Sequence, residues 1–337
     1  MKIGILRFSA LGDIIVSAVF LPYLKTLYPN CEIDWFVDER FGGILDDSPC
    51  IKKLHKIPLK KLLKSFNPFN IYRLYQDLKS HEKYDILIDM QGLVKSSVIG
   101  SLLKKDKFVG FDKNSIREKM ASIFYDQGIC IPYERNILER NASLLYGAFG
   151  EQAGLEVCLQ DRKSVFGCTQ NGKNKIDALD CFEGNKKTIL FVLEASKENK
   201  TYPVQQYIEL AKLMRDENVK ILLLWHAYPQ KAQQIFNAIN TSNDVFLLPQ
   251  LNLDELKALI KKVDIVIGGD TGVTHLAWAM QRASITLYGN TPMERFKLFG
   301  TKNISLSGNI CANYHKNDFS ISKIQPKTID KEIRGLL

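Results

Sequence analysis

Short apolar runs alternate with amphipathic segments along most of the chain, and this alternation limits the fold more than any other feature. The runs expected to form buried strands are Lys2–Phe8, Glu32–Val37, Tyr84–Met90, Thr188–Leu193, Val219–Trp225, Val245–Leu248, Asp264–Ile267 and Ile285–Tyr288. Segments with helical periodicity separate them, among them Ile14–Leu27, Val94–Leu103, Pro203–Asp216, Pro229–Ile239 and Leu253–Val263. Because strands and helices alternate, the sequence predicts an α/β fold with parallel sheets covered by helices on both faces.

A polar stretch rich in Gly, Asn, Lys and Asp interrupts this alternation between Cys158 and Lys187. A chain of 337 residues suits about two domains of ordinary size, and such a stretch is typical of a domain boundary. We therefore expect two doubly wound domains that face each other across a cleft. Their expected extents are 1–160 for the N-terminal domain, 161–186 for a linker region, 187–322 for the C-terminal domain and 323–337 for a terminal helix.

The net charge of +9 is concentrated in residues 51–119, which carry 16 Lys/Arg against 7 Asp/Glu. Such a basic region suits phosphates, an anionic membrane surface or nucleic acid, although an ordinary solvated charged face is the more common explanation. The seven cysteines show no C-x-x-C spacing, so we expect neither a disulfide framework nor a zinc site, and a reducing cytoplasm fits. No secretion signal is expected, and the apolar run Ile14–Leu24 is too short to span a bilayer.

Polar, glycine-containing turns follow three of the expected strands, at the sheet edge where ligands of such folds bind. Ser9–Asp13 opens a helix after the first strand, with Asp13 in the first helical turn. Asp13 is either a functional carboxylate or simply an acid favoured by the helix dipole. Gly268–Leu276 follows a later strand, and its glycines, threonines and His275 suit a diphosphate at a helix start. Glu194–Lys200 supplies a lysine suited to neutralise phosphate.

Several common cofactor and metal motifs are missing from the sequence. No G-x-G-x-x-G follows Phe8, and there is no D-x-D, H-E-x-x-H or G-x-x-x-x-G-K-[ST]. A nicotinamide-dependent oxidoreductase is therefore disfavoured, and neither a metal nor a cofactor is expected. A nucleic-acid-binding module, suggested by the pI of about 9.0, lacks a basic motif with interleaved aromatic residues.

Three segments together resemble the bacterial lipopolysaccharide heptosyltransferases (glycosyltransferase family nine). They are S-A-L-G-D at 9–13, Q-G-L-V-K-S at 91–96 and G-D-T-G-V-T-H-L at 269–276. The second of these, with Arg117–Tyr125 and Lys200 before an aromatic residue and proline, is most similar to heptosyltransferase I. The resemblance implies a GT-B fold of two Rossmann-like domains, with the donor bound by the C-terminal domain and the acceptor by the N-terminal one. It also implies metal-independent, inverting transfer of L-glycero-D-manno-heptose from ADP-heptose to the inner Kdo of Kdo2–lipid A. A heptosyltransferase acting on a later, already heptosylated core acceptor is the alternative.

The resemblance also implies roles for individual residues. Asp13 matches the general base, and Lys200 matches a catalytic lysine that contacts the donor phosphates. The donor-binding positions are Ser196, Lys200, Gln230, Leu251, Asp270, Thr271, Gly272 and His275. The expected acceptor-binding positions are Lys60, Lys61, Lys64, Gln91, Lys95, Lys113, Arg117 and Lys119. Two positions depart from the family pattern, since Ala195 replaces a frequent hydroxyl residue and Gln230 a frequent glutamate.

For a lipid-linked acceptor, the resemblance implies a cytoplasmic enzyme that is peripheral at the cytoplasmic face of the inner membrane. The expected partners are ADP-heptose and Kdo2–lipid A, without nucleic acid and without an obligate protein partner.

Overall fold

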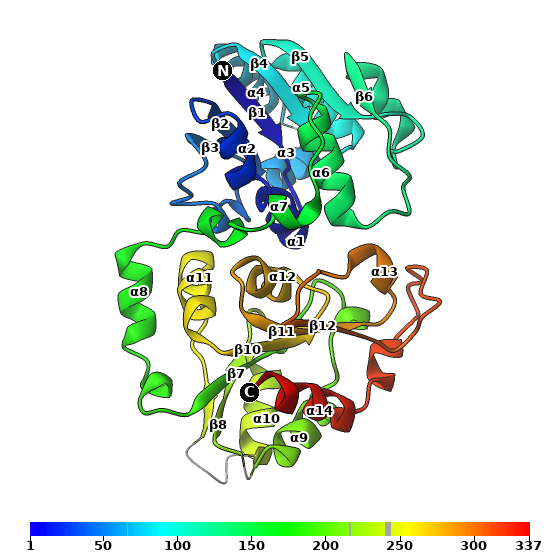
Figure 1. Cartoon of the computed structure of the whole chain (residues 1–337). Coiled ribbons are helices and arrows are strands. Elements are labelled where there is room, and N and C mark those ends of the chain that lie inside the picture. The colour runs from blue at the N-terminus through cyan, green and yellow to red at the C-terminus, as the bar shows by residue number, and fades with distance from the viewer. Residues whose placement is uncertain (66, 216, 240–243) are drawn as a thin grey trace. The chain divides into compact units, whose positions relative to one another are not determined.

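The structure is a computed structural model that describes residues 1–65, 67–215, 217–239 and 244–337, with the side chains of 63–65 left out. The chain divides into two compact units, Met1–Gly167 and Cys168–Leu337, and each contains one parallel six-stranded sheet (Figure 1). In the described residues, no helix is both long and apolar enough to cross a membrane.

The sheet of the first unit has the strand order β3-β2-β1-β4-β5-β6. Its strands are β1 (Lys2–Leu6), β2 (Glu32–Asp38), β3 (Lys53–Ile57), β4 (Tyr84–Asp89), β5 (Lys105–Phe111) and β6 (Gln127–Ile129). Its helices are α1 (Leu11–Ala18), α2 (Leu21–Leu27), α3 (Leu59–Ser65), α4 (Pro68–Ser80), α5 (Val94–Leu102), α6 (Ile137–Gly147) and α7 (Leu155–Cys158), with the 3₁₀ helix η2 (Lys119–Phe124). The order reverses between β1 and β4, and this switch point is where doubly wound sheets bind ligands.

One face of the first sheet is covered by α3, α4 and α5, whose inner side chains share one hydrophobic cluster. The cluster joins Leu59, Leu78 and Ile99 from these helices to Phe36 and Leu87 from the strands. Elsewhere in the unit, α1 packs against α6. These contacts hold the helices that begin at the carboxyl ends of β1, β3 and β4.

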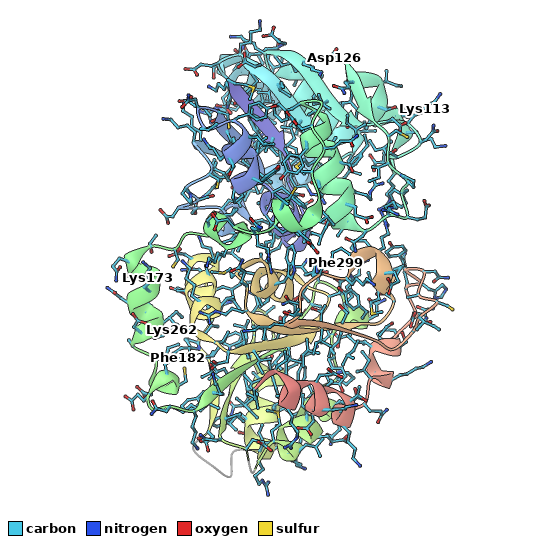
Figure 2. The ribbon with its side chains drawn as sticks, in the orientation of Figure 1. Lys113, Asp126, Lys173, Phe182, Lys262 and Phe299 are labelled. Carbon is cyan, nitrogen blue, oxygen red and sulfur yellow. The ribbon has the colours of Figure 1, made fainter. Side chains whose placement is uncertain are left out.

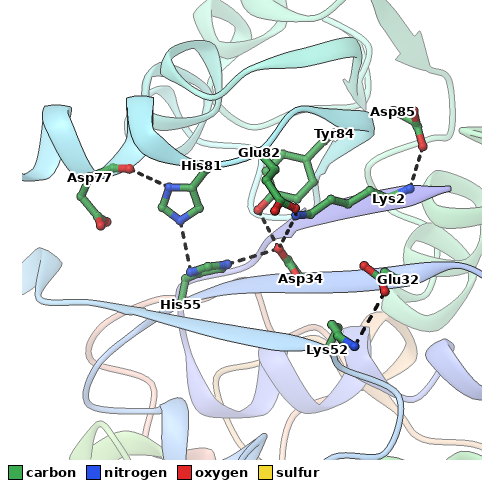
Figure 3. A network of polar contacts seen from close by, with 10 residues as sticks. All are labelled: Lys2, Glu32, Asp34, Lys52, His55, Asp77, His81, Glu82, Tyr84 and Asp85. Carbon is green, nitrogen blue, oxygen red and sulfur yellow. Dashed lines mark hydrogen bonds and ion pairs between the residues drawn. The ribbon is translucent and has the colours of Figure 1, made fainter.

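A polar network crosses the first sheet on the side of α4 (Figure 3). Asp34 on β2 accepts a hydrogen bond from the Tyr84 hydroxyl (2.9 Å) and lies 3.4 Å from His55 Nε2 on β3. His55 Nδ1 lies 3.2 Å from Nε2 of His81, the residue that ends α4. Burial opposes ionisation of Asp34, but its contacts with His55, Tyr84 and Lys2 keep its pKa below the usual value. The network therefore ties the C-terminal end of α4 to the sheet.

The sheet of the second unit has the strand order β12-β11-β10-β7-β8-β9. When the strands of each sheet are numbered from one to six along the chain, both sheets have the order 3-2-1-4-5-6. Its strands are β7 (Lys187–Val192), β8 (Val219–Leu224), β9 (Val245–Leu247), β10 (Ile265–Gly269), β11 (Ala283–Tyr288) and β12 (Asn303–Ser307). Its helices are α8 (Gln170–Asp177), α9 (Val204–Leu213), α10 (Pro229–Ile239), α11 (Leu253–Lys262), α12 (Gly272–Ala279), α13 (Met293–Phe296) and α14 (Pro326–Leu336). Its switch point lies between β7 and β10, so two sheets of Rossmann order form the chain, as predicted.

The predicted helix Ile14–Leu27 was wrong in one respect, because the chain forms two helices there, α1 and α2. Pro22 lies in the first turn of α2, where its missing N–H costs nothing, and a continuous helix would have required that donor. The strands β3, β5, β6 and β12 were not predicted from the sequence. Three of these are short or edge strands with exposed or half-buried residues, so they lack an uninterrupted apolar run.

The polar stretch expected to be a linker contains helix α8, which packs against α11. The Asp254 carboxylate accepts hydrogen bonds from the backbone N–H (3.1 Å) and hydroxyl (2.6 Å) of Thr169. Lys262, at the end of α11, pairs with Asp177 at 2.6 Å and lies 4.6 Å from the ring centroid of Phe182. Figure 2 shows Lys262 and Phe182 together at this side of the second unit.

All seven cysteines are free thiols. Cys31, Cys50, Cys158 and Cys181 are buried, and burial raises the pKa of each, that of Cys50 and Cys181 to about 11. Cys168 is half-buried, and Cys130 and Cys311 are exposed.

Candidate functional site

Asp13 lies in the first turn of α1, just beyond the carboxyl end of β1. Its Oδ1 lies 3.1 Å from Nη2 of Arg7, and its Oδ2 accepts a hydrogen bond from the Ala10 N–H at 3.1 Å. The Arg7 side chain is 9% exposed and that of Asp13 is 38% exposed. Arg7 and the Ala10 N–H therefore fix the orientation of the Asp13 carboxylate, and the exposed part of the side chain remains accessible to a ligand.

Arg7 was not predicted as part of this site. The guanidinium also donates to the Met90 carbonyl, so it joins the carboxyl ends of β1 and β4. The sequence feature that could have indicated this role is the position of Arg7 inside the otherwise apolar end of the run Lys2–Phe8. A buried arginine needs a partner, and the nearby acid at 13 satisfies that need.

Gln91, predicted to bind the acceptor, holds the turn that leads to Asp13. Its Oε1 accepts hydrogen bonds from the backbone N–H groups of Phe8 and Ser9, both at 3.0 Å. Its own N–H donates to the buried carboxylate of Asp89 at 2.9 Å. These contacts give Gln91 a positioning role that was not predicted, and its contact with the acceptor stays a prediction.

An open hollow of about 300 Å³ lies at the same edge of the first sheet. It is lined by Phe8, Ser9, Asp38, Arg40, Leu59, Lys60 and Lys95. Arg40 is bound by both carboxylate oxygens of Asp38, at 2.8 and 3.0 Å. Within the described parts of the chain, Lys60 and Lys95 form no ion pair, so their charges are available to an anionic ligand.

The remaining predicted acceptor residues differ in their surroundings. Lys61 is exposed and already pairs with Glu39 at 2.7 Å. Arg117 and Lys119 flank Glu118, whose carboxylate accepts a hydrogen bond from the Val94 N–H (2.8 Å) next to Lys95. Lys113 lies on an exposed loop after β5, at the edge of the unit in Figure 2, and is not one of the residues that line the hollow. The side chain of Lys64 lies outside the described residues.

The second unit carries an ion-paired cluster at its own switch point. Asp270 follows β10, and Lys200 ends the segment after β7. Lys200 Nζ lies 2.5 Å from one carboxylate oxygen of Asp270, and His275 Nε2 lies 3.0 Å from the other. Burial opposes ionisation of Asp270, but His275 and Lys200 hold its pKa well below the usual range. The Asp270 carboxylate therefore stays ionised near neutral pH and is shared by Lys200 and His275.

The start of α12 adds groups that lack partners. Thr271 Oγ1 and His275 Nδ1 are buried and have no hydrogen-bond partner among the residues described. The first amides of any helix also lack intrahelical acceptors, and the helix dipole favours an anion there. Gly269 lets this turn form, because a Cβ on it would lie 1.9 Å from the Lys200 carbonyl oxygen. Together these groups suit a phosphate.

The other predicted donor residues lie on loops of the same unit. Ser196 and Gln230 are exposed and Leu251 is half-buried. Sequence reasoning missed Glu194, which accepts hydrogen bonds from the N–H groups of His226, Ala227 and Tyr228 at 2.8–3.2 Å. Glu194 thereby fixes the loop that precedes Gln230.

Two sheets of Rossmann order, each with polar side chains at its switch point, form the architecture of the GT-B class. The sequence matches Glycosyltransferase family 9 (heptosyltransferase) over residues 71–328. A relative from Campylobacter coli, lipopolysaccharide heptosyltransferase 1, is 36% identical over 350 residues, covering 100% of this chain and 99% of the relative. The chain therefore belongs to glycosyltransferase family 9.

Solved structures show the same fold. The Escherichia coli heptosyltransferase WaaC with ADP is 22% identical with a TM-score of 0.82, and the match covers all of both chains. The E. coli ADP-heptose lps heptosyltransferase II is 20% identical with a TM-score of 0.76, covering 100% of this chain and 98% of that one.

Proposed function

We propose that the protein transfers L-glycero-D-manno-heptose from ADP-heptose to the inner Kdo of Kdo2–lipid A, in lipopolysaccharide inner-core biosynthesis. The observation that carries the proposal is the switch point of the second sheet, where the chemistry of Lys200 and of the start of α12 suits a diphosphate. The sugar and acceptor are supported by the full-length similarity to a lipopolysaccharide heptosyltransferase 1. A solved E. coli relative is also described with ADP-2-deoxy-2-fluoro heptose.

The proposed reaction is a single inverting displacement. The acceptor hydroxyl oxygen forms a bond to the anomeric carbon as the bond from that carbon to the diphosphate oxygen breaks. Asp13 takes the hydroxyl proton, which becomes more acidic as the new bond develops. Lys200 and the amides of α12 stabilise the negative charge that builds on the departing ADP. In this scheme Ser196, Gln230 and Leu251 hold the donor, while Arg7 keeps the Asp13 carboxylate oriented.

The acceptor is assigned to the first unit, where Lys60 and Lys95 line the hollow. Kdo carries carboxylates and lipid A carries phosphates, so unpaired cations there are complementary to the acceptor. An acceptor embedded in a bilayer places the enzyme peripherally at the cytoplasmic face of the inner membrane.

The direct test is incubation with ADP-heptose and Kdo2–lipid A, followed by mass spectrometry for the addition of one heptose. A parallel reaction contains an acceptor that already carries one heptose. Addition to Kdo2–lipid A alone supports the proposal. Addition only to the heptosylated acceptor would assign the enzyme to a later step, and no addition to either would refute the proposal.

The double variant Lys60→Ala/Lys95→Ala is expected to raise the KM for Kdo2–lipid A about 30-fold, because two charges are lost at about 1 kcal/mol each near an anionic surface. Affinity for ADP, measured by calorimetry, should not change, because both lysines belong to the first unit. Lys61→Ala is the matched control, since Lys61 is exposed and already paired with Glu39. Equal effects of the control and the double variant would show that general surface charge, not the hollow, binds the acceptor.

A further inference from the structure

Helix α4 exposes aromatic side chains along most of its length. Phe69, Ile71, Tyr72 and Tyr75 are 61%, 46%, 58% and 40% exposed. Of the helix's 13 residues, only Leu78 is buried. Soluble monomers rarely leave a group of large apolar side chains uncovered, and such a group marks a binding surface.

The exposed surface continues beyond α4. Helices α3, α4 and α5 pack on the same face of the sheet through one hydrophobic cluster. Their sides opposite the sheet therefore face away from the core in the same direction. The 3₁₀ helix η2 packs against α5 and against β5. It leaves Met120 and Ile123 68% and 78% exposed. We call Phe69, Tyr72, Tyr75, Met120 and Ile123 the outer face.

Cations are interleaved with these apolar side chains. The Arg73 guanidinium lies 5.0 Å from the ring centroid of Phe69, and Lys79 Nζ lies 5.8 Å from that of Tyr75. Apart from Lys64, whose side chain lies outside the described residues, the cations on α3, α4, η2 and the loop before η2 are Lys60, Lys61, Arg73, Lys79, Lys113, Arg117 and Lys119. The acids on these segments are Asp77, Asp112 and Glu118.

Aromatic rings at headgroup depth with Lys and Arg reaching the phosphates are typical of proteins that lie on a bilayer. Protein–protein interfaces, in contrast, are depleted of lysine. The charge therefore favours an anionic lipid surface over a protein partner.

The attachment of α4 to the sheet determines which end of the helix lies near the carboxyl edge of the sheet. Its C-terminal end is anchored by Leu78 in the core and by the contact of His81 with His55 (Figure 3). Because α4 ends shortly before β4 begins, its N-terminal half lies towards the carboxyl edge of the sheet. Phe69 and Tyr72 are thus on the end of α4 directed to the edge that carries Lys60 and Lys95.

We propose that the outer face docks on an anionic lipid bilayer, with Phe69 and Tyr72 inserted among the headgroups and the surrounding cations on the lipid phosphates. Docking would present the hollow of the first unit to headgroups at the same surface. The docking itself stands on α4 and η2, and only the identity of the lipid-borne acceptor rests on the proposed function.

The test is co-sedimentation of the full-length protein with vesicles of phosphatidylglycerol and phosphatidylethanolamine that contain no lipopolysaccharide precursor. Phe69→Ser/Tyr72→Ser is expected to weaken vesicle binding about tenfold or more, because two large apolar side chains no longer enter the interface. Ile310→Ser/Phe319→Ser is the matched control, since these residues are 90% and 51% exposed on the second unit. The control should bind as wild type does, and neutral phosphatidylcholine vesicles should bind wild type more weakly.

Two results would overturn the proposal. One is vesicle binding that is absent in wild type or equal in the two double variants. The other is self-association that depends on Phe69 and Tyr72 without vesicle binding, which would make the outer face a protein interface. Turnover of a water-soluble Kdo acceptor should be unchanged in Phe69→Ser/Tyr72→Ser. Because the vesicle assay needs no turnover, failure of heptose transfer would refute the proposed function without touching the docking result.

Discussion

Asp13→Asn is expected to lower kcat by about 10²–10⁴-fold, the usual contribution of a general base. Asparagine has nearly the same shape but cannot accept the proton of the acceptor hydroxyl. It keeps an oxygen that can accept from Arg7 or from the Ala10 N–H, so the turn should persist. Affinity for ADP and the melting temperature should therefore stay close to wild type, as measured by calorimetry and thermal unfolding.

Glu139→Gln is the matched control for this variant. Glu139 also lies in the first turn of a helix, α6, and pairs with an arginine, Arg135, at 2.8 Å. Its replacement removes the same kind of dipole and ion-pair contact, on the order of 0.3–1 kcal/mol, without touching the proposed base. If Asp13→Asn kept more than about a third of wild-type kcat, far from the base contribution, Asp13 would be a helix-start residue only.

Lys200→Met is expected to reduce kcat by about 10²–10³-fold, as for the loss of one preorganised group that stabilises a developing anion. It should also lower ADP affinity and the melting temperature. The melting temperature falls because the Asp270 side chain, which is 5% exposed, would keep its charge with His275 as its remaining partner in the cluster. Removing one member of a buried ion pair is costly for this reason.

Adding Asp270→Asn separates these two roles of Lys200. Asparagine can still hydrogen-bond to His275 but carries no charge to compensate, so Lys200→Met/Asp270→Asn should recover part of the lost melting temperature. Turnover should remain low. Lys231→Met is the control, because Lys231 pairs at 3.0 Å with Glu198, whose side chain is 70% exposed. Recovery of turnover in the double variant would mean that Lys200 acts only as a structural partner of Asp270.

The central strands could be predicted from the sequence because physical burial leaves a clear signature. Strands such as β1 and β7 are buried on both faces and therefore appear as continuous apolar runs. The edge strand β3, Lys53–Ile57, mixes two lysines and a histidine with two apolar residues inside the basic region, so its pattern is typical of solvated surface. β12 is half-buried throughout and gave an equally weak signal.

The glycine-containing turns of the candidate site were also visible, but their pairings were not. Lys200 and Asp270 are 70 residues apart, and their contact depends on β7 lying beside β10. Alternation of strands and helices does not specify that neighbour relation. Arg7 was missed because the first strand was expected to run to Phe8, whereas β1 ends at Leu6 and leaves Arg7 to reach Asp13.

The distribution of the cysteines makes the protein suitable for fluorescence measurements. Cys130 is exposed on the first unit and Cys311 on the second, whereas the four buried thiols are covered and have raised pKa values. Thiol-reactive dyes require an accessible thiolate, so labelling at neutral pH should favour these two positions. With Cys168 replaced by serine, a donor and acceptor dye pair at Cys130 and Cys311 would report the separation of the two units in solution. Energy transfer could then be followed as ADP is added.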